Sequence, residues 1–287
     1  MKNNCTVFAN AKINIHLEVV GKRENGYHDI SSVFQSVTLN DRLDIALNSS
    51  GEVSVLCEGA EIVGENLAKL AAERFLGRAG LELGAEITLK KNIPLSAGLG
   101  GGSADAAAVL YGLNTMTDFP LEKDDLSEIA LSLGADVPFC LFGGIKRAEG
   151  LGERLTDIAV KDECFVILIK QHKKQSTGQM YNLVDSLEKG EAVTERVVNA
   201  LEGDDKIALK KYCRNDFLAV SDDKAELEKI ICNLYESGAF LAGLSGSGPT
   251  VFALFENEPR KETISELKNL YKEVYLCKTA DCGVETE

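Results

Sequence analysis

Four glycines between residues 98 and 102 lead directly into an alanine-rich segment, and this junction limits what the chain can fold into. The run reads PLSAGLGGGSADAAAVL over residues 94–110. Alanine has the highest intrinsic helix propensity, so we predict a helix from Ser103 to about Leu113. Glycines let bare backbone approach a ligand, and a helix start presents unpaired N–H groups and the positive end of its dipole. The junction therefore predicts an anion site suited to a triphosphate.

Two common glycine-rich nucleotide motifs do not fit this segment. A Walker-type loop has lysine directly after its last glycine, whereas Ser103 stands here. A dinucleotide-binding loop follows the first strand of its domain and has an acidic residue about 20 positions later, whereas some ninety residues precede these glycines. A flexible loop before a helix is the alternative explanation. The strand-like residues and Pro94 ahead of the glycines favour phosphate binding over it.

Size and charge narrow the class of protein. The 287 residues, 45% hydrophobic and 26% charged, can bury a full core in one large domain or two modest ones. Asp and Glu outnumber Lys and Arg by 45 to 31, which gives a formal net charge of −14. Such a surface repels polyanions, so we expect no nucleic-acid partner, and a local site must hold any nucleotide. No apolar run reaches the ~18 residues of a transmembrane helix, so we expect no membrane partner.

The eight cysteines indicate a reducing compartment. They are scattered, with no C-x-x-C pair, no paired metal-ligand spacing and no secretory leader ahead of them. Cys277 and Cys282 form the only close pair, and without neighbouring histidines they are expected to pack in the structure rather than to bind zinc. We therefore predict reduced thiols in a cytoplasmic protein.

Strand and helix patterns follow one another irregularly along the chain. Segments rich in β-branched and apolar residues predict strands at 13–20, 33–39, 43–48, 53–57, 85–89, 165–170 and 274–279. Periodicity and composition predict helices at 66–78, 103–113, 124–133, 225–236 and 261–271, and Asp124 is expected to cap the third of them. Without a regular βαβ order, the predicted fold class is α+β. A change of pattern near 155–163 suggests two domains, 1–158 and 159–287.

Three segments together resemble motifs of the GHMP kinases, the superfamily of galactokinase, homoserine kinase and mevalonate kinase. They are AKINIHL at 11–17, PLSAGLGGGSADAA at 94–107 and GLSGSGPTVF at 243–252, in the superfamily's order and spanning most of the chain. The resemblance implies the two-domain GHMP kinase fold, with a ribosomal-protein-S5-like N-terminal domain and a ferredoxin-like C-terminal domain. It also implies a small-molecule kinase that uses ATP and Mg²⁺.

Two further segments narrow the resemblance to one branch of the superfamily. GKRENGYH at 21–28 and GADVPFC at 134–140 do not usually occur together in other members. That branch phosphorylates the 2-hydroxyl of a cytidine-diphosphate-linked methylerythritol in the non-mevalonate route to isoprenoid precursors. The resemblance implies the same small-molecule substrate here, and a monomer or weak homodimer is expected.

Three alternatives stay open. The first is another GHMP kinase, acting on homoserine or a mevalonate-type acid, because the glycine motif alone does not select a substrate. The second is a noncatalytic ATP-binding sensor on the same fold, which the presence of both Lys12 and Asp136 disfavours. The third is a nucleic-acid module of the related ribosomal-protein-like fold, which the acidic composition disfavours.

The resemblance assigns the chemistry to Lys12 and Asp136. Phosphoryl transfer needs positioning, charge stabilisation and a group that accepts the proton of the attacking hydroxyl. Asp136 lies between Gly134 and Pro138, where a carboxylate can project from a fixed turn. It is implied to be the catalytic base, and Lys12 the cation that keeps it ionised and steadies charge on the transferred group. Taken singly, a turn carboxylate and a solvated lysine would explain the two residues.

The resemblance also assigns the nucleotide and the metal. It implies nucleotide contacts for Pro94, Ala97, Gly98, Leu99, Gly100, Gly101, Gly102, Ser103, Ala104, Asn66, Leu67 and Lys91. The Ser103 hydroxyl would lie near Mg²⁺, and it could also cap the helix. The sequence shows no all-protein metal cage, so substrate phosphates are expected to supply most metal ligands.

Substrate contacts are implied for Asn14, Tyr27, His28 and Tyr181. Tyr27 and His28 follow a turn, and in the resembled family this pair lies against the cytosine and hydrogen-bonds its polar edge. Tyr181 could supply a second stacking face, although a half-buried core aromatic explains it equally well. Asn14 is expected to orient a ligand beside Lys12.

Overall fold

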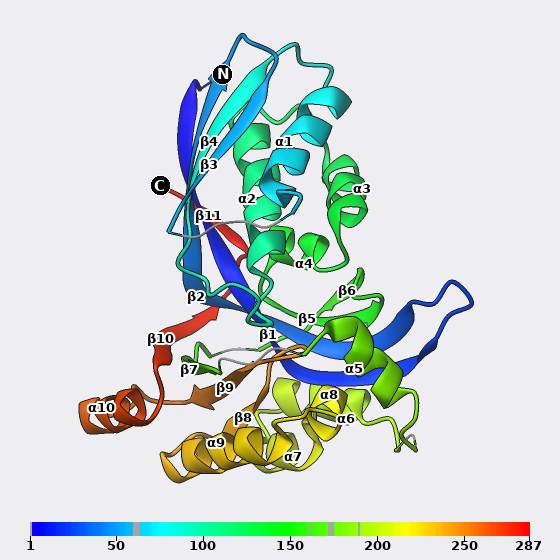
Figure 1. Ribbon diagram of the computed structural model, residues 1–287, viewed down its shortest axis with the longest axis vertical. Helices are drawn as coiled ribbons and strands as arrows, with labels where there is room; N and C mark the ends of the chain where they lie inside the picture. Colours follow the sequence, from blue (N-terminus) through cyan, green and yellow to red (C-terminus); the bar gives the residue numbers. More distant parts are fainter. Residues whose placement is uncertain (1, 60–63, 161, 172–174, 189) are drawn as a thin grey trace.

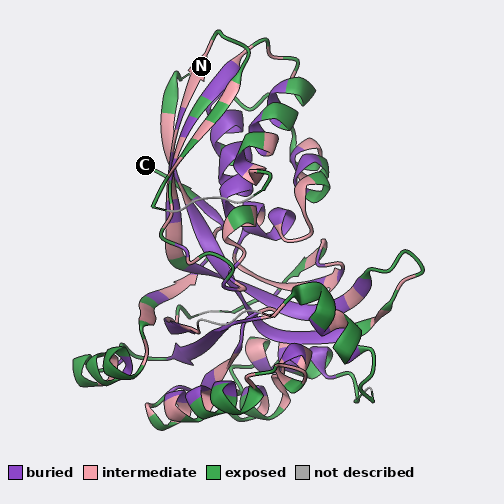
Figure 2. Cartoon of the chain, viewed as in Figure 1, coloured by how far each residue is buried: buried purple, intermediate pink, exposed green. Residues whose placement is uncertain are grey.

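Two long antiparallel strands, β1 (Asn4–Lys22) and β2 (His28–Asn48), run the length of the molecule and organise the fold (Figure 1). The computed structural model describes residues 2–59, 64–160, 162–171, 175–188 and 190–287. Residues 9–19 of β1 are all buried, because other elements cover both faces of the strand (Figure 2). Burial on both faces removes the apolar and polar alternation that marks a half-exposed strand. The predicted segment 13–20 is therefore only part of a longer strand.

Eleven strands of the described residues join in one sheet. On the side away from β1, β2 pairs in succession with β4 (Gly84–Lys90), β10 (Glu273–Ala280) and β5 (Ile145–Gly150). The sheet continues from β10 through β7 (Phe165–Lys170), β9 (Thr250–Phe255) and β8 (Leu241–Leu244). Three short strands complete it: β3 (Val53–Glu58) on β4, β6 (Arg154–Asp157) on β5, and β11 (Val284–Thr286) on β1.

Four helices cover the first half of the sheet: α1 (Leu67–Arg78), α2 (Gly101–Met116), α3 (Lys123–Leu133) and α4 (Val137–Phe142). Helix α2 lies at the centre, in contact with β1, α1 and α4 (Figure 1). Its alanines at 104 and 106–108 are fully buried, because small side chains let its neighbours approach closely. This packing fixes the start of α2 beside the middle of β1.

Six further helices surround the second half: α5 (Thr177–Val184), α6 (Thr194–Glu202), α7 (Lys206–Tyr212), α8 (Asp216–Ala219), α9 (Lys224–Glu236) and α10 (Lys261–Leu270). Ile230 of α9 and Leu267 of α10 belong to an apolar cluster with Ile169 of β7. Val166 and Leu168, also on β7, belong instead to the cluster that fills the first half. Both apolar clusters therefore meet at β7, and the domain boundary at 158 stays a prediction.

The α+β class is confirmed, and the structure corrects two predicted helix starts. Helix α2 begins at Gly101, because Gly100, with a φ of 69°, occupies the cap position. Ser103 therefore lies within the first turn, and the prediction that it could cap the helix is wrong. Helix α3 begins at Lys123 after Glu122, so Asp124 lies in its first turn and is not the cap.

None of the helices that the structure describes has the length and apolar character needed to cross a membrane. All eight cysteines lie in the described part of the chain and are free thiols. Burial raises the pKa of the Cys277 thiol to about 12, so this group stays protonated at neutral pH.

Candidate active site

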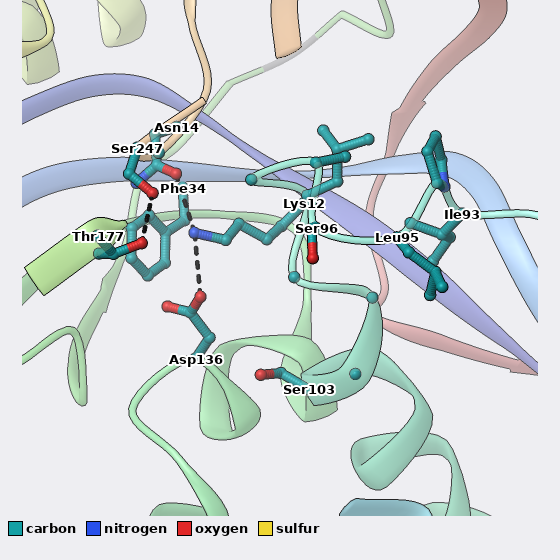
Figure 3. Close-up of a pocket in the computed structure, with 18 of the residues that line it drawn as sticks. Lys12, Asn14, Phe34, Ile93, Leu95, Ser96, Ser103, Asp136, Thr177 and Ser247 are labelled. Atoms are coloured by element: carbon teal, nitrogen blue, oxygen red, sulfur yellow. Dashed lines mark hydrogen bonds and ion pairs between the residues drawn. The ribbon is translucent and has the colours of Figure 1, made fainter. Parts of the chain in front are cut away.

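A cavity of about 370 Å³ opens between the glycine-rich loop, the middle of β1 and β2, and the start of α5 (Figure 3). The predicted site residues that line it are Lys12, Asn14, Leu67, Lys91, Pro94, Ala97, Gly98, Leu99, Gly100, Gly101, Gly102, Ser103, Asp136 and Tyr181. The predicted residues outside the lining are Asn66, Ala104, Tyr27 and His28. The fold therefore brings segments from both halves of the chain to one cavity.

The glycine-rich loop requires glycine at two positions. Gly98 and Gly100 have φ values of 76° and 69°, in the left-handed region that favours glycine. A Cβ on Gly98 would lie 2.5 Å from the Ser245 carbonyl oxygen, and one on Gly100 would lie 2.9 Å from Cγ of Lys12. The loop therefore packs its bare backbone against β1 and the turn after β8.

Hydrogen bonds hold two loop carbonyls on the strand side. The Lys12 N–H donates to the Leu99 carbonyl at 3.0 Å, and the Ser245 hydroxyl donates to the Gly98 carbonyl at 2.9 Å. The same hydroxyl accepts the Asn14 backbone N–H at 3.3 Å. On the opposite side, the N–H groups of residues 101–103 begin α2 and have no acceptor within the helix. Because these residues line the cavity, their N–H groups suit a bound anion.

A buried lysine and a partly open carboxylate meet in the cavity. Lys12 Nζ lies 3.2 Å from Asp136 Oδ2, and the two side chains are 6% and 33% exposed. The ammonium also donates to Asn14 Oδ1 at 2.9 Å and lies 4.4 Å from the centre of the Phe34 ring. Asp136 occupies the cap position of α4, and Pro138 stands in the first turn of that helix. The cation is thus fixed on three sides, and the carboxylate faces the cavity (Figure 3).

Lys91 lies behind the loop between two acidic side chains. Its Nζ contacts Asp41 and lies 2.6 Å from Asp105 Oδ2, and all three side chains are buried. Asp41 also accepts the N–H groups of Asn92 and Ile93, at 2.6 and 2.8 Å, where the chain enters the loop. Burial raises the pKa of Asp105 to about 8, although the Lys91 ammonium acts against the rise. The predicted nucleotide-side lysine therefore also supports the loop.

Two of the other predicted nucleotide residues, Asn66 and Ala104, take structural positions. Asn66 caps α1, and its side-chain oxygen accepts the N–H groups of Ala68 and Lys69. Leu67, the next residue, lines the cavity. Ala104 is fully buried and donates its N–H to the Gly100 carbonyl at 2.8 Å, which closes the first turn of α2.

Tyr27 and His28 are adjacent in sequence but lie in different surroundings in the structure. Tyr27 is 63% exposed at the hairpin turn, whereas His28 is buried. The His28 ring stacks on Tyr181 with centroids 4.6 Å apart, and its Nε2 lies 2.9 Å from Asp185 Oδ1. Tyr181 meets Phe217 edge-on at 4.9 Å, and burial raises the pKa of Tyr181 to about 12. His28 and Tyr181 therefore form one aromatic unit at the edge of the cavity, without Tyr27.

Several site residues, Phe34 and Asp185 among them, had no role in the sequence-based prediction. Ser245 and Ser247 lie inside the quoted segment 243–252, whose glycines and hydroxyl groups the sequence already indicated near the site. Phe34 and Asp185 carry no local pattern, because their roles come from residues distant in sequence. Thr177 and Ser247 also line the cavity, and their hydroxyl oxygens lie 2.8 Å apart between α5 and the turn after β8.

Comparison with family models and curated proteins gives matches over most of the chain. The model for the GHMP kinases N terminal domain matches residues 66–144, and the model for the GHMP kinases C terminal matches residues 207–273. A protein of Thermoanaerobacter pseudethanolicus, named 4-diphosphocytidyl-2-C-methyl-D-erythritol kinase, is 38% identical over 284 residues, 97% of each chain. One of Syntrophomonas wolfei with the same name is 38% identical over 281 residues, 96% of this chain and 98% of its own.

Solved structures show the same arrangement of elements. A crystal structure of 4-(cytidine 5'-diphospho)-2C-methyl-D-erythritol kinase superposes with a TM-score of 0.79 at 29% identity, covering 96% of this chain and 99% of that one. Homoserine kinase from Cytophaga hutchinsonii superposes with a TM-score of 0.76 at 21% identity, covering 100% and 98%. The second likeness shows a shared fold alone.

Proposed function

The chain belongs to the GHMP kinase family, and from this premise we propose that it transfers the γ-phosphoryl group of ATP to the 2-hydroxyl of 4-diphosphocytidyl-2-C-methyl-D-erythritol. The observation that carries the chemistry is the Lys12–Asp136 ion pair of 3.2 Å, which shares one cavity with the glycine-rich loop. The substrate follows from near full-length relatives that bear the name of this kinase.

The loop and the start of α2 are the proposed phosphate site. ATP supplies the transferred group, and Mg²⁺, when bound, offsets the negative charge of the phosphates. The residues present suit both: residues 101–103, whose N–H groups have no acceptor within the helix, line the cavity for the phosphates, and the Ser103 hydroxyl is an oxygen ligand for a hard cation. The described residues hold no group of three His, Cys, Asp or Glu side chains able to bind a metal. Phosphate oxygens would therefore supply most of its ligands.

Asp136 is the proposed base. Its carboxylate, one third exposed, accepts the proton of the acceptor hydroxyl as that oxygen attacks the phosphorus. Lys12 pairs with this carboxylate at 3.2 Å and holds it in place. Contacts with Asn14 and Phe34 hold the Lys12 ammonium close to where the phosphoryl group would be transferred. Its positive charge would offset the negative charge of that group.

The acceptor end of the substrate is proposed to lie toward Asn14 and the aromatic unit of His28 and Tyr181. Asn14 lines the cavity next to Lys12, within reach of a polyol hydroxyl. Asp185 fixes one edge of the His28 ring, and Tyr181 covers one face. The remaining ring edge suits the polar groups of a cytosine, and exposed Tyr27 would close over the base from the hairpin turn.

The setting in which the protein acts is also part of the proposal. We propose a cytoplasmic monomer or weak homodimer that works on small molecules, with no nucleic-acid or membrane partner. The net charge of −14 supports the exclusion of nucleic acid.

A coupled assay of ADP release tests the reaction. Purified protein with ATP and Mg²⁺ is offered 4-diphosphocytidyl-2-C-methyl-D-erythritol, homoserine and mevalonate in parallel. We expect turnover of the first alone. Turnover of homoserine or mevalonate without turnover of the cytidine compound would overturn the substrate assignment, and ATP binding without turnover of any alcohol would favour a sensor.

A further inference from the structure

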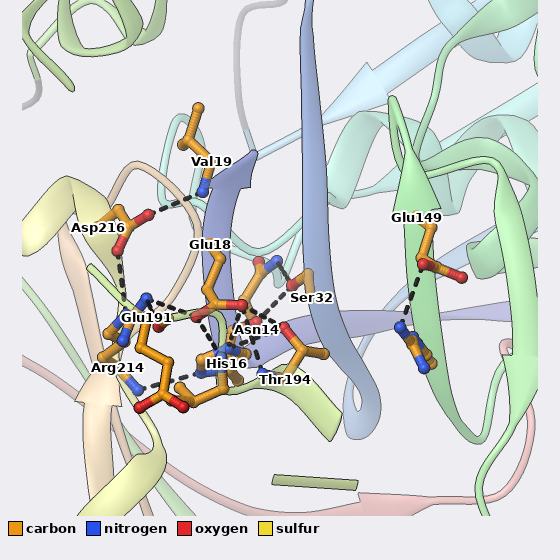
Figure 4. A network of polar contacts seen from close by, with 12 residues as sticks. Asn14, His16, Glu18, Val19, Ser32, Glu149, Glu191, Thr194, Arg214 and Asp216 are labelled. Atoms are coloured by element: carbon orange, nitrogen blue, oxygen red, sulfur yellow. Dashed lines mark hydrogen bonds and ion pairs between the residues drawn. The ribbon is translucent and has the colours of Figure 1, made fainter. Parts of the chain in front are cut away.

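A buried serine on β2 contacts the side chain that holds the proposed catalytic lysine. Asn14 receives the Lys12 ammonium on its Oδ1 at 2.9 Å and donates from its Nδ2 to the Ser32 hydroxyl oxygen at 3.0 Å. That hydroxyl in turn donates to the backbone carbonyl of His16 (Figure 4). Asn14 is 1% exposed and Ser32 is fully buried. The contact between Asn14 and Ser32 is therefore buried, although Lys12 and Asn14 also line the cavity.

The direction of each hydrogen bond in this chain is fixed. A serine hydroxyl has one hydrogen, and Ser32 gives it to the His16 carbonyl, so toward Asn14 its oxygen can only accept. A flipped Asn14 amide would put its NH₂ group against the Lys12 ammonium and its oxygen against an oxygen without a hydrogen. Both contacts would be lost, and at Ser32, which is fully buried, no water can replace the lost hydrogen bond. Ser32 thus selects the amide orientation that accepts from Lys12.

The strand register explains why a serine stands at this point. The pairing of β1 with β2 shifts between Asn14 and His16, and such an irregularity re-aims the side chains that follow it. Asn14 before the shift and Leu17 after it both line the cavity. Ser32 contacts a side chain on one side of the shift and a carbonyl on the other, so it fixes the strand where the cavity residues change face.

We propose that Ser32 is a positioning residue for phosphoryl transfer, which acts by orienting the Asn14 amide so that Lys12 is held against Asp136. The inference rests on the proposed function, since it concerns the same reaction. Ser32 has no exposed surface and lies outside the described lining of the cavity, so it acts on the reaction only through Asn14. Its loss should therefore slow turnover and leave the binding of ATP unchanged.

The first test compares two serines on one strand. Ser32→Ala removes the acceptor for Asn14, and we expect kcat to fall roughly 5- to 30-fold with KM for ATP within about twofold of wild type, as for one or two lost hydrogen bonds. Ser36→Ala is the matched control, because Ser36 is also on β2, is 1% exposed, and its hydroxyl has no hydrogen-bond partner among the described residues. It should retain wild-type kcat. A Ser32→Ala enzyme with wild-type kcat would overturn the proposal.

A double-mutant cycle separates positioning from a general effect on folding. Asn14→Asp keeps an acceptor for Lys12 but cannot donate to Ser32, so Ser32→Ala should cost less than about twofold in kcat when added to it. If the same loss appears in both backgrounds, together with a matching fall in melting temperature, Ser32 is a structural residue and the proposal is wrong.

A crystal structure of Ser32→Ala gives a readout that does not depend on the substrate. We expect Lys12 Nζ to leave its present place, 2.9 Å from Asn14 Oδ1 and 3.2 Å from Asp136 Oδ2. An unmoved ammonium would overturn the role of Ser32 whatever the acceptor is. By contrast, a wild-type protein without turnover of the cytidine compound would overturn the proposed function and leave this structural result to decide on Ser32.

Discussion

The two walls of the cavity are built in opposite ways. The wall proposed for phosphates is one continuous segment, residues 94–103, whose glycines and helix start lie together in the sequence. The wall proposed for the acceptor collects Lys12, Phe34, Asp136 and Tyr181 from separate elements. A continuous segment can encode its shape locally, whereas a collected wall depends on strand register and helix packing. We therefore expect mutations in the continuous wall to impair nucleotide binding and mutations in the collected wall to impair phosphoryl transfer.

Asp136→Asn should impair phosphoryl transfer at the collected wall, the one built from separate elements. It should leave the continuous wall, residues 94–103, intact. The amide keeps the size of the side chain but cannot accept the acceptor's proton, so we expect kcat to fall about 10²- to 10⁴-fold. ATP affinity should stay within about twofold, because the loop is untouched. Single-turnover rates and a nucleotide titration measure the two effects. Asp157→Asn is the control, since that carboxylate is 85% exposed on β6; wild-type turnover by Asp136→Asn would remove the residue from the mechanism.

Glu18→Gln should destabilise the contact between the two halves of the molecule, on which the collected wall depends. The Glu18 carboxylate, on β1, accepts from the Thr194 hydroxyl at 2.6 Å and the Val193 N–H at 2.9 Å, and it pairs with Arg214 at 2.5 Å. Figure 4 shows Glu18 between Thr194 and Arg214. Burial alone would raise the pKa of Glu18, but hydrogen bonds from His16, Thr194 and Val193 outweigh it and lower the pKa to about 2. The charged group therefore stabilises the fold, and its loss should cost on the order of 3 kcal/mol at neutral pH.

The pH dependence of that loss follows from the direction of the shift. The folded-state pKa lies below the ordinary value of 4.5, so the stabilisation is complete above pH 4.5 and disappears as the pH falls to about 2. Urea unfolding of wild type and Glu18→Gln across this range should give free energies that converge at the acid end. Glu195→Gln is the control, because its ion pair with Arg147 is exposed and worth little. A constant difference at every pH would contradict the assignment.

Gly98→Ala tests the continuous wall. Alanine at a φ of 76° is strained, and its Cβ would lie 2.5 Å from the Ser245 carbonyl oxygen, so the loop must move. We expect KM for ATP to rise roughly 10- to 100-fold. Gly51→Ala has nearly the same φ, 75°, with nothing within 4 Å of the added atom, so it measures strain without a clash. Equal ATP kinetics in Gly98→Ala and wild type would show that the loop does not hold the nucleotide.

Asp185→Asn should have the smallest effect, at the far end of the collected wall. The hydrogen bond from His28 lowers the pKa of Asp185, so the carboxylate is charged and fixes the ring. An amide in its place would loosen His28, and we expect KM for the cytidine substrate to rise about 3- to 10-fold while KM for ATP stays unchanged. Lys22→Gln removes the 3.4 Å contacts of Lys22 with the same carboxylate and with Asn182 Oδ1 but leaves the contact of His28 with Asp185, so it serves as the control. A rise in KM for ATP instead would place His28 at the nucleotide.

The sequence was sufficient to predict individual helices, although not always the residue at which each one begins. The helix after the glycines was predicted from its alanines, but it begins at Gly101 in the structure and not at Ser103 as predicted. The left-handed Gly100 allows the helix to begin inside the glycine run, where propensity alone would not place it. The cap at Asp124 failed for a similar reason, because Glu122 already has the extended backbone of a cap.

Pairings between distant residues lay beyond sequence reasoning. Tyr27 and His28 are neighbours in sequence, yet one is exposed and the other stacks on Tyr181, because adjacent residues of a strand end point to opposite faces. For Tyr181 the sequence offered two explanations, a stacking face for the substrate and a half-buried core aromatic. In the structure it is half-buried and also lines the cavity, so its position fits both. Ser32 and Asp185 carried no signal at all, because their partners come from other elements.

The order of residues by itself determined the glycine-rich loop, the mixed fold class and the likeness to one kinase family, since these depend on glycine freedom, helix propensity and motif spacing that act over short stretches of chain. The resemblance already implied that Lys12 pairs with Asp136, but only the tertiary structure decided that Asn14 and Phe34 also contact the lysine and that Ser32 accepts from Asn14. Those contacts arise where β1 and β2 change register and where α4 packs beside them, and geometry of that kind depends on long-range pairing rather than on local sequence.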